Sequence, residues 1–278
     1  MKMFVLALAA AAVCSAAPHF EVASIKRSKD CPPGLRSGGE NTPGRLVLHC
    51  QLLSGMIISA YVRFADGRFT TQPRPVPISG GPSWIDSDFY DITAKAEGTP
   101  ADAVMWGPML QALLEDRFQL KIHRQTRAIP VYALVQSEGG AKLRPFVEGS
   151  CIPVDRSKFP PPPAASGNCH ARGRRDGMKE IDDAQAMTVS EFSRIFLNGA
   201  LDRPVIDQTG ITGTFDFHLE YGIDEPTPRF NAGGAEPGGS AGPSIFTAVR
   251  EQLGLRLIST TGPGESLVID HVERPSEN

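Results

Sequence analysis

One pattern constrains the fold of this chain more than any other: an amphipathic helix of about three turns, followed by two strand-like runs, occurs three times. The three occurrences lie at 106–136, 188–221 and 244–272. Each helix has one apolar face, and each strand pair can bury one face of a sheet. We therefore expect an α+β fold in which repeated αββ units form antiparallel sheet with helices packed on one side, joined by long Gly/Pro-rich loops.

Local signals mark the ends of two of these helices. Thr188 and Glu191 have the spacing of a capping box, in which each side chain can accept a hydrogen bond from the other residue's backbone amide. Ser244 is suited to cap the third helix at its start and Gly254 at its end. The sequence therefore predicts helices that begin after Thr188 and Ser244.

The third unit shows how the strand pairs are expected to connect. Its strands are predicted at Leu255–Thr260 and Ser266–Val272, with a turn across Gly262–Gly264, because Gly-Pro-Gly is a strong turn signal. The first unit has comparable strands at Gln119–Arg124 and Pro130–Gln136. We expect the two strands of the third unit to form a hairpin.

The loops separate the units and suggest the domain boundaries. The chain contains 28 Gly and 24 Pro, and two aperiodic stretches, 150–186 and 223–242, are predicted to be long surface loops. We divide the chain into a signal peptide (1–17), an N-terminal α+β part with the first unit (18–149), a Pro-rich disulfide loop (150–186) and a C-terminal part with two units (187–278).

The first residues predict export from the cytoplasm. Lys2 precedes an apolar run from Phe4 to Val13, and small residues around Ala17 suit cleavage by signal peptidase. No later stretch approaches the roughly 18 apolar residues of a membrane span. A periplasmic or secreted location is therefore expected. A formal net charge of −3 argues against a general nucleic-acid binder, which needs a surplus of Lys and Arg.

Four cysteines follow the signal peptide, as expected for a disulfide-bonded exported protein. Cys31 and Cys50 flank one loop, and Cys151 and Cys169 flank another. Four cysteines allow three connectivities, and the two local pairs are the ones we predict. Metal ligation is the alternative, but the chain has no C-x-x-C spacing.

Motifs of known catalytic chemistry are almost absent, and no cofactor is expected. The chain lacks H-E-x-x-H, the P-loop pattern and G-x-G-x-x-G. A G-x-S-x-G pattern occurs at 238–242, around Ser240. The Gly/Pro-rich residues before it cannot form the buried strand that a nucleophile elbow needs, so we interpret it as a chance match.

The best polar constellation is Asp216, His218 and Glu220. Alternation along a strand places all three on one face at spacings of about 6.5–7 Å. A His with two carboxylates could ligate a metal if a neighbouring strand supplied a further ligand. Amphipathic alternation already explains the pattern, so a solvated outer face is the favoured interpretation. Further polar candidates of the same kind are His123, His271 and Glu273.

Two smaller features also allow a structural and a functional interpretation. Arg172, Arg174 and Arg175 form a basic cluster, which we interpret as a solvated loop because acidic residues follow it closely. An anionic ligand is the alternative. Trp84 is interpreted as a packing residue, although its position after Gly-Gly-Pro-Ser would also suit a turn that faces a ligand.

Several stretches resemble a large soil-associated, mainly acidobacterial family of exported proteins of unknown function. They are FEVASIK, ISGGPSWIDSDFYDITAKAEG, MLQALLEDRFQLKIHRQTRAIPVYAL, RPVIDQTGITGTFDFHLEY and SLVIDHVERPSEN. The resemblance covers nearly the whole mature chain and implies an extracytoplasmic location, but it brings no catalytic residues. The αββ units also resemble, more weakly, the periplasmic modules at the N-termini of secretins and TonB-dependent receptors, which is a likeness of fold alone.

These observations favour a non-catalytic extracytoplasmic module that binds a protein or a small ligand in the cell envelope. Binding at an exposed sheet edge is one expected mode, because unpaired strand groups accept an added strand. The alternative is an extracytoplasmic metal-assisted hydrolase that uses the face of Asp216, His218 and Glu220. A pocket in which His218 meets a ligand from a second strand would favour the enzyme, and an uncovered edge strand would favour binding.

Overall fold

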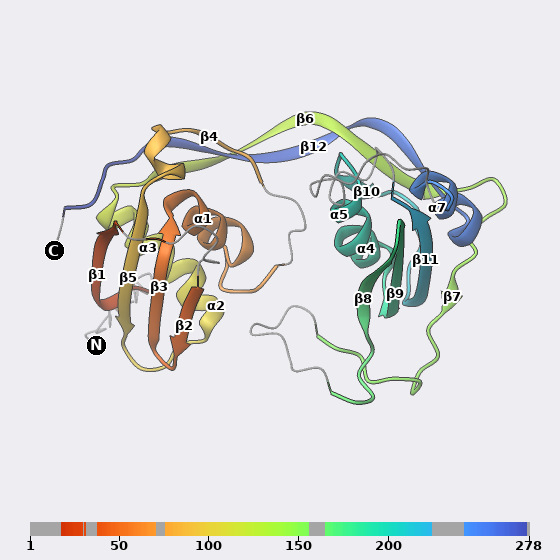
Figure 1. The fold of residues 1–278 in the computed structure, drawn as a ribbon, viewed down its shortest axis with the longest axis horizontal. Helices are drawn as coiled ribbons and strands as arrows, with labels where there is room; N and C mark the ends of the chain where they lie inside the picture. Colours follow the sequence, from red (N-terminus) through yellow and green to blue (C-terminus); the bar gives the residue numbers. More distant parts are fainter. Residues whose placement is uncertain are drawn as a thin grey trace, which may run out of the picture.

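The computed structural model describes residues 18–29, 31, 38–70, 76–155, 165–223 and 242–276. It contains three four-stranded sheets and short helices, so the expected α+β class is confirmed at that level. Figure 1 shows two lobes, each with its own sheet and helices, joined by a long two-stranded ribbon that arches from one to the other. The predicted signal peptide, 1–17, lies outside the described residues.

The first lobe contains an antiparallel sheet with the strand order β1-β5-β3-β2. Apolar and polar residues alternate along β5, so one sheet face is buried. Leu46 and Ile92 on this face are fully buried in the first core. The strands are β1 (Phe20–Ser28), β2 (Gly38–Thr42), β3 (Arg45–Leu52) and β5 (Phe89–Ala96).

Two short helical segments cover the buried face of this sheet. Met56, Leu110 and Leu114 supply apolar side chains to the first core. Gly107 bends the second segment, because its φ and ψ are not helical. The segments comprise α1 (Leu53–Ile58) with η1 (Ser59–Arg63), and α2 (Asp102–Val104) with η3 (Met105–Met109) and α3 (Leu110–Arg117); a single turn, η2 (Ser83–Asp86), precedes β5.

The second lobe contains a sheet with the order β7-β11-β9-β8 and a separate core. Phe217, Leu219 and Tyr221 are buried on the face of β11 that the helices cover, and Phe192 stacks on Phe217 with ring centroids 4.2 Å apart. The elements are β7 (Arg144–Pro145), β8 (Ala171–Asp176), β9 (Lys179–Met187), β11 (Phe215–Gly222), α4 (Val189–Phe192), η4 (Ser193–Leu197), α5 (Asn198–Ala200) and α7 (Ile245–Leu253).

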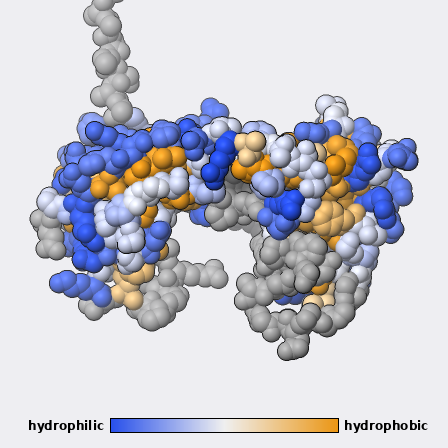
Figure 2. Space-filling model, turned by 90° about the horizontal axis from the view of Figure 1, so that it is seen from above, coloured by the Kyte–Doolittle hydropathy of each residue, from blue (hydrophilic) through white to orange (hydrophobic). Residues whose placement is uncertain are grey.

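The ribbon consists of β6 (Lys121–Gln136) and β12 (Leu255–His271), which pair antiparallel along their length. One end of the ribbon contributes to the first core through Leu267, and the other end contributes to the second core through Leu134. Two short strands, β4 (Ile78–Gly80) and β10 (Val205–Asp207), extend the ribbon into the third sheet, of order β10-β6-β12-β4. Figure 2 shows hydrophobic residues on its viewed face in separate areas over both lobes.

The hairpin predicted for the third unit is wrong. Residues 262–264, expected to form its turn, lie within the continuous strand β12, and residues 125–129, between the two strands predicted for the first unit, lie within β6. Gly262 and Gly264 instead leave room for side chains: a Cβ on Gly262 would lie 2.6 Å from Cδ1 of Ile206, and one on Gly264 would overlap the side chain of Ile129. The glycines therefore mark close approach rather than a turn.

The repeated αββ units are not found in the structure. The two strands of the second unit, β10 and β11, belong to different sheets, and β10 pairs parallel to β6. The long strands of the first and third units pair with each other. The expectation of a loop over 150–186 is also wrong in part, because β8 and β9 form a hairpin there.

The predicted helix ends are confirmed. Thr188 and Glu191 form a capping box, with Thr188 Oγ1 accepting from the Glu191 amide at 3.2 Å and Glu191 accepting from the Thr188 amide at 2.9 Å. Ser244 Oγ accepts from the amide of Thr247. Gly254 ends α7 with a φ of 64°, a left-handed conformation that glycine adopts without strain.

A buried carboxylate ties the C-terminal segment to the first lobe. Asp88, whose side chain is 8% exposed, accepts hydrogen bonds from Arg27 at 2.6 Å and from Arg274 at 3.0 Å. The guanidinium of Arg274 also lies 4.9 Å from the ring centre of Trp84. Trp84 therefore has a packing role here, as expected.

Candidate functional site

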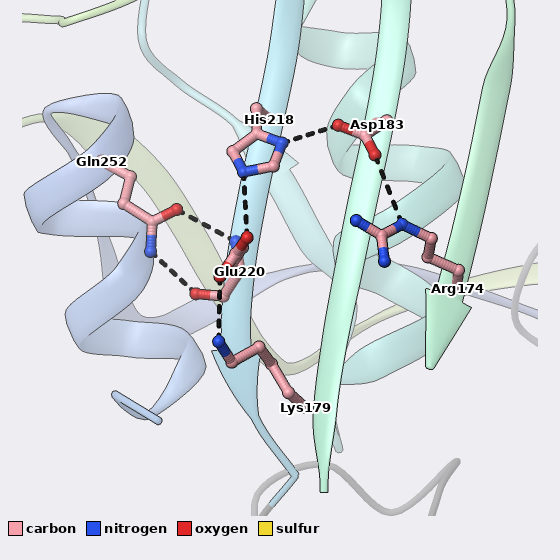
Figure 3. Close-up of polar contacts among 6 residues, drawn as sticks. All are labelled: Arg174, Lys179, Asp183, His218, Glu220 and Gln252. Atoms are coloured by element: carbon pink, nitrogen blue, oxygen red, sulfur yellow. Dashed lines mark hydrogen bonds and ion pairs between the residues drawn. The ribbon is translucent and has the colours of Figure 1, made fainter. Parts of the chain in front are cut away.

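The outer face of the second lobe's sheet carries a connected row of polar side chains (Figure 3). His218 lies between two carboxylates: its Nδ1 is 2.6 Å from Asp183 on β9, and its Nε2 is 3.3 Å from Glu220 on β11. On the far side of Asp183 lies Arg174 of β8, at 4.0 Å. The row thus crosses three neighbouring strands.

Lys179 continues the row beyond Glu220, to which its Nζ donates a hydrogen bond of 3.1 Å. This hydrogen bond holds the pKa of Glu220 below its usual range, although partial burial acts against it. The charge and hydrogen bond of His218 lower the pKa further. Glu220 is therefore ionised at neutral pH and serves as a counter-ion for Lys179.

The three predicted candidates share a face, as the alternation indicates, and His218 contacts Glu220, whereas Asp216 is bonded elsewhere. Asp216 accepts a hydrogen bond from the amide of Ala186 at 3.1 Å, which holds it at the end of the row. Within the described residues no group of three or more His, Cys, Asp or Glu is arranged to hold a metal ion. The side chain of His218 is 51% exposed, so the row lies on an open face.

One edge of this sheet is closed by a side chain. Gln252 of α7 accepts a hydrogen bond from the Glu220 amide at 3.0 Å and donates one to the Glu220 carbonyl at 2.7 Å (Figure 3). A single amide group thus occupies the positions that a neighbouring strand's backbone would take. Farther along the same edge, the two-residue strand β7 pairs with Phe215 and Asp216.

The opposite edge is formed by β8, and it is open in the described part of the chain, where β8 pairs with β9 alone. All six of its residues are exposed. Arg172 and Arg174 extend on the outer face beside Asp183, whereas Arg175 lies on the other face, 4.0 Å from Glu180. The predicted solvated loop is therefore a basic edge strand.

The inner face beside β8 contains two acidic residues that were not among the predicted site residues. Glu180 and Asp182 are buried, and an oxygen of each lies 2.8 Å from the point where a Cβ on Gly173 would stand. The hydroxyl of Tyr221 donates to Asp182 at 3.4 Å, and the group lines a cavity of about 260 Å³. Their alternation on one strand is the sequence feature that indicates a shared face.

The remaining polar candidates form separate surface pairs. His123 contacts Asp270 across the ribbon at 2.8 Å, and His271 contacts Glu273 at 3.0 Å. Neither pair reaches the row on the second lobe's sheet. Ser240 of the G-x-S-x-G pattern lies outside the described residues.

Both predicted disulfides are present. Cys31 and Cys50 are bonded with their Cα atoms 5.7 Å apart, and Cys151 and Cys169 with theirs 5.0 Å apart. The second bond closes the loop that leads into β8. In the part of the chain that the structure describes, no helix has the length and apolar character to cross a membrane. These features are compatible with an extracytoplasmic protein.

The described residues thus form an α+β fold with an open row of polar side chains beside an edge strand. A family model matches residues 68–272, and its description is "Protein of unknown function (DUF3738)". The match covers well over half of the chain, so the protein belongs to this family, and the resemblance to a family of unknown function is confirmed. No curated protein and no solved structure matches the chain significantly.

Proposed function

We propose that the protein is a periplasmic or secreted binding module, to which a partner protein adds an extended acidic segment along β8. The observation that carries the proposal is the contrast between the two edges of one sheet. The β11 edge is closed by Gln252, whereas β8 pairs on one side only within the described residues. An edge strand with unpaired amides and carbonyls accepts an added strand.

The charges of β8 favour an acidic segment. An added strand would place alternate side chains beside Arg172 and Arg174 on the outer face. Carboxylates at those positions would form ion pairs with the two guanidinium groups, whereas lysines would be repelled. Glu220, His218 and Asp183 lie farther along the same face and are already paired with one another.

The proposal is tested with a synthetic peptide that alternates glutamate with threonine, and with its lysine counterpart. We expect wild-type protein to bind the acidic peptide and not the basic one. The double variant Arg172→Gln/Arg174→Gln should bind about tenfold more weakly, since each exposed ion pair contributes roughly 0.2–1 kcal/mol. Fluorescence anisotropy at low and high salt measures both effects, and salt should weaken wild-type binding.

The matched control is Lys121→Gln/Arg127→Gln, which removes two exposed cations from β6 and changes the net charge equally. This variant should bind like the wild type. An equal loss of affinity for the acidic peptide in both double variants would show that binding depends on net charge alone, and the proposed binding edge would then be wrong. Stoichiometric zinc in the purified protein that is lost in His218→Ala would favour the metal-assisted hydrolase instead.

The proposed location has its own test. Mass spectrometry of the protein recovered from periplasm or medium should give a mature chain that begins at Pro18, with Cys31–Cys50 and Cys151–Cys169 oxidised. Recovery of the uncleaved chain with four free thiols from the cytoplasm would overturn the location.

A further inference from the structure

The sheet of the first lobe also ends in an open strand edge. β1 is the last strand of this sheet and, in the described part of the chain, pairs with β5 alone. Figure 1 shows β1 at the outer end of the first lobe, on the side away from the second lobe. The pairing with β5 is regular from Val22 to Ser28, because the register shift lies between Phe20 and Val22. This regular stretch presents unpaired backbone amides and carbonyls on its other side.

The outer face of β1 carries an exposed apolar residue and two opposite charges. Ile25 is buried in the first core, so alternation places Val22 and Lys26 on the outer face. Val22 is 62% exposed. The Lys26 ammonium is exposed and forms no ion pair or hydrogen bond with a described residue. Glu21, at the start of the strand, accepts a hydrogen bond of 3.1 Å from Lys95 through one of its two carboxylate oxygens.

This order of charges fits a second, antiparallel copy of the same strand. A twofold axis perpendicular to the sheet pairs two copies of β1 in opposite directions and keeps their outer faces on the same side. With the axis at Ser24, Val22 of one copy lies opposite Lys26 of the other. The hydrocarbon stem of Lys26 then covers Val22, and its ammonium lies beside the carboxylate of Glu21. The contact occurs twice, once on each side of the axis.

A cavity below the same edge favours a whole second copy over an isolated strand. Its volume is about 350 Å³. The residues of β1 and α3 that line it include Phe20, Ala23, Ala112 and Leu113, together with Asp116 and Arg117, which pair with each other at 2.9 Å. Because the twofold axis keeps the inner faces on one side, the two α3 helices lie on the same side of the joined sheet. A second copy therefore brings a helix as well as a strand to this edge.

We infer that the protein forms a homodimer in which two copies of β1 pair antiparallel about Ser24 and join two four-stranded sheets into one continuous sheet. The inference is independent of the proposed function, because β8 belongs to the sheet of the second lobe. A single short strand pair buries less area than a standard interface of about 1,600 Å², so we expect a weak, concentration-dependent dimer.

Sedimentation equilibrium of the full chain tests the inference. The wild type should show a monomer–dimer equilibrium at protein concentrations below about 1 mM, the range of weak complexes. Glu21→Lys and Lys26→Glu should each weaken association about tenfold, because each variant places like charges beside each other twice in its own homodimer. An equimolar mixture of the two variants should associate like the wild type. In the mixed dimer the new lysine of one chain faces the new glutamate of the other, and the second contact keeps its natural pair.

The matched controls are Glu138→Lys and Arg256→Glu, which make the same charge changes at exposed residues of the second lobe and should associate like the wild type. Ser24→Cys tests the register. It should form an intermolecular disulfide under mild oxidation, since Cβ atoms opposite each other on antiparallel strands lie about 4.5–5.5 Å apart. Thr93→Cys, at the neighbouring position of β5, should not.

Three results would overturn the inference. The first is a wild type that stays monomeric up to about 1 mM. The second is a dimer that neither charge reversal weakens, or a mixture of the two variants that does not recover. The third is a Ser24→Cys variant that forms no more intermolecular disulfide than Thr93→Cys. Circular dichroism verifies that each variant is folded.

Discussion

At the scale of single residues, Asp88 is the clearest case of one side chain determining a local arrangement. It joins Arg27 of β1 to Arg274 of the C-terminal segment. Burial by itself would raise the pKa of Asp88, but the hydrogen bonds and charges of Arg274 and Arg27 outweigh burial and lower it. The ionised carboxylate is thus the form that the folded protein stabilises.

We predict that Asp88→Asn lowers the free energy of unfolding at pH 7 by about 1–3 kcal/mol, because it removes charge-assisted hydrogen bonds from a buried site. Since the folded pKa is lowered, the contribution is present above the unfolded pKa, near 3.9, and is lost as the pH falls through the folded value. Urea unfolding should therefore show the difference between wild type and variant shrinking below about pH 4. As a control, Asp270→Asn removes the carboxylate of an exposed pair and should lower the free energy of unfolding by less than about 1 kcal/mol.

Two glycines give opposite predictions for the same substitution. A Cβ on Gly107 would overlap the carbonyl oxygen of Phe64, whereas a Cβ on Gly55 meets nothing within 4 Å. Gly107→Ala should therefore destabilise the protein by about 1–3 kcal/mol or more. Gly55→Ala, within α1, should stabilise it by roughly 0.5–1 kcal/mol. Thermal unfolding measures the change in melting temperature of each variant relative to the wild type. Changes of the same sign in both variants would contradict the assigned contacts.

At the scale of elements, local signals were predictable and distant pairings were not. The capping residues Thr188 and Ser244 act within one turn, so their sequence neighbours suffice to reveal them. The ribbon pairs residues more than a hundred positions apart, and no local pattern shows that Gly262 faces Ile206 rather than forming a turn. The face of Asp216, His218 and Glu220 was predictable, because alternation is a property of one strand.

The β8–β9 hairpin was missed because its charged residues resemble a solvated loop. Its turn nevertheless has a recognised signal: Gly177, whose φ is 60°, is the first of the two residues between β8 and β9. A glycine at the first position of a two-residue hairpin turn is typical of type II′ turns. The basic edge strand and the buried pair Glu180 and Asp182 both depend on this turn. Because the turn was not recognised in the sequence, neither of these parts of the candidate site was predicted.

The disulfide before β8 gives a prediction at this scale. Cys151→Ser/Cys169→Ser should lower the free energy of unfolding by about 2–4 kcal/mol, since the bond closes an 18-residue separation. Hydrogen exchange should accelerate at β8 more than at β11, which is held by neighbours on both sides. Uniform acceleration over the whole sheet would show that the bond does not act on the edge in particular.

At the scale of the whole molecule, the same two strands of the ribbon, β6 and β12, contribute residues to both cores. Both tryptophans of the chain, Trp84 and Trp106, pack against the first core, so tryptophan fluorescence reports on the first lobe alone. Phe192 is fully buried in the second core. The two lobes can therefore be perturbed and observed separately.

We predict that Phe192→Ala lowers the urea midpoint read by tryptophan fluorescence. The substitution should lower the free energy of unfolding of the second core by about 3–5 kcal/mol, and β6 and β12 should transmit this destabilisation to the first lobe. Far-UV circular dichroism should give the same midpoint. An unchanged fluorescence midpoint with a lowered dichroism midpoint would show that the lobes unfold independently.

We propose β8 as the edge at which an acidic segment is bound. Hydrogen–deuterium exchange of the full chain, with and without the peptide that alternates glutamate with threonine, tests it most directly. We expect added protection of amides within Ala171–Asp176 and little change at Glu220, whose amide is already bonded to Gln252. Protection confined to other elements, or none at a peptide concentration that saturates binding, would contradict it.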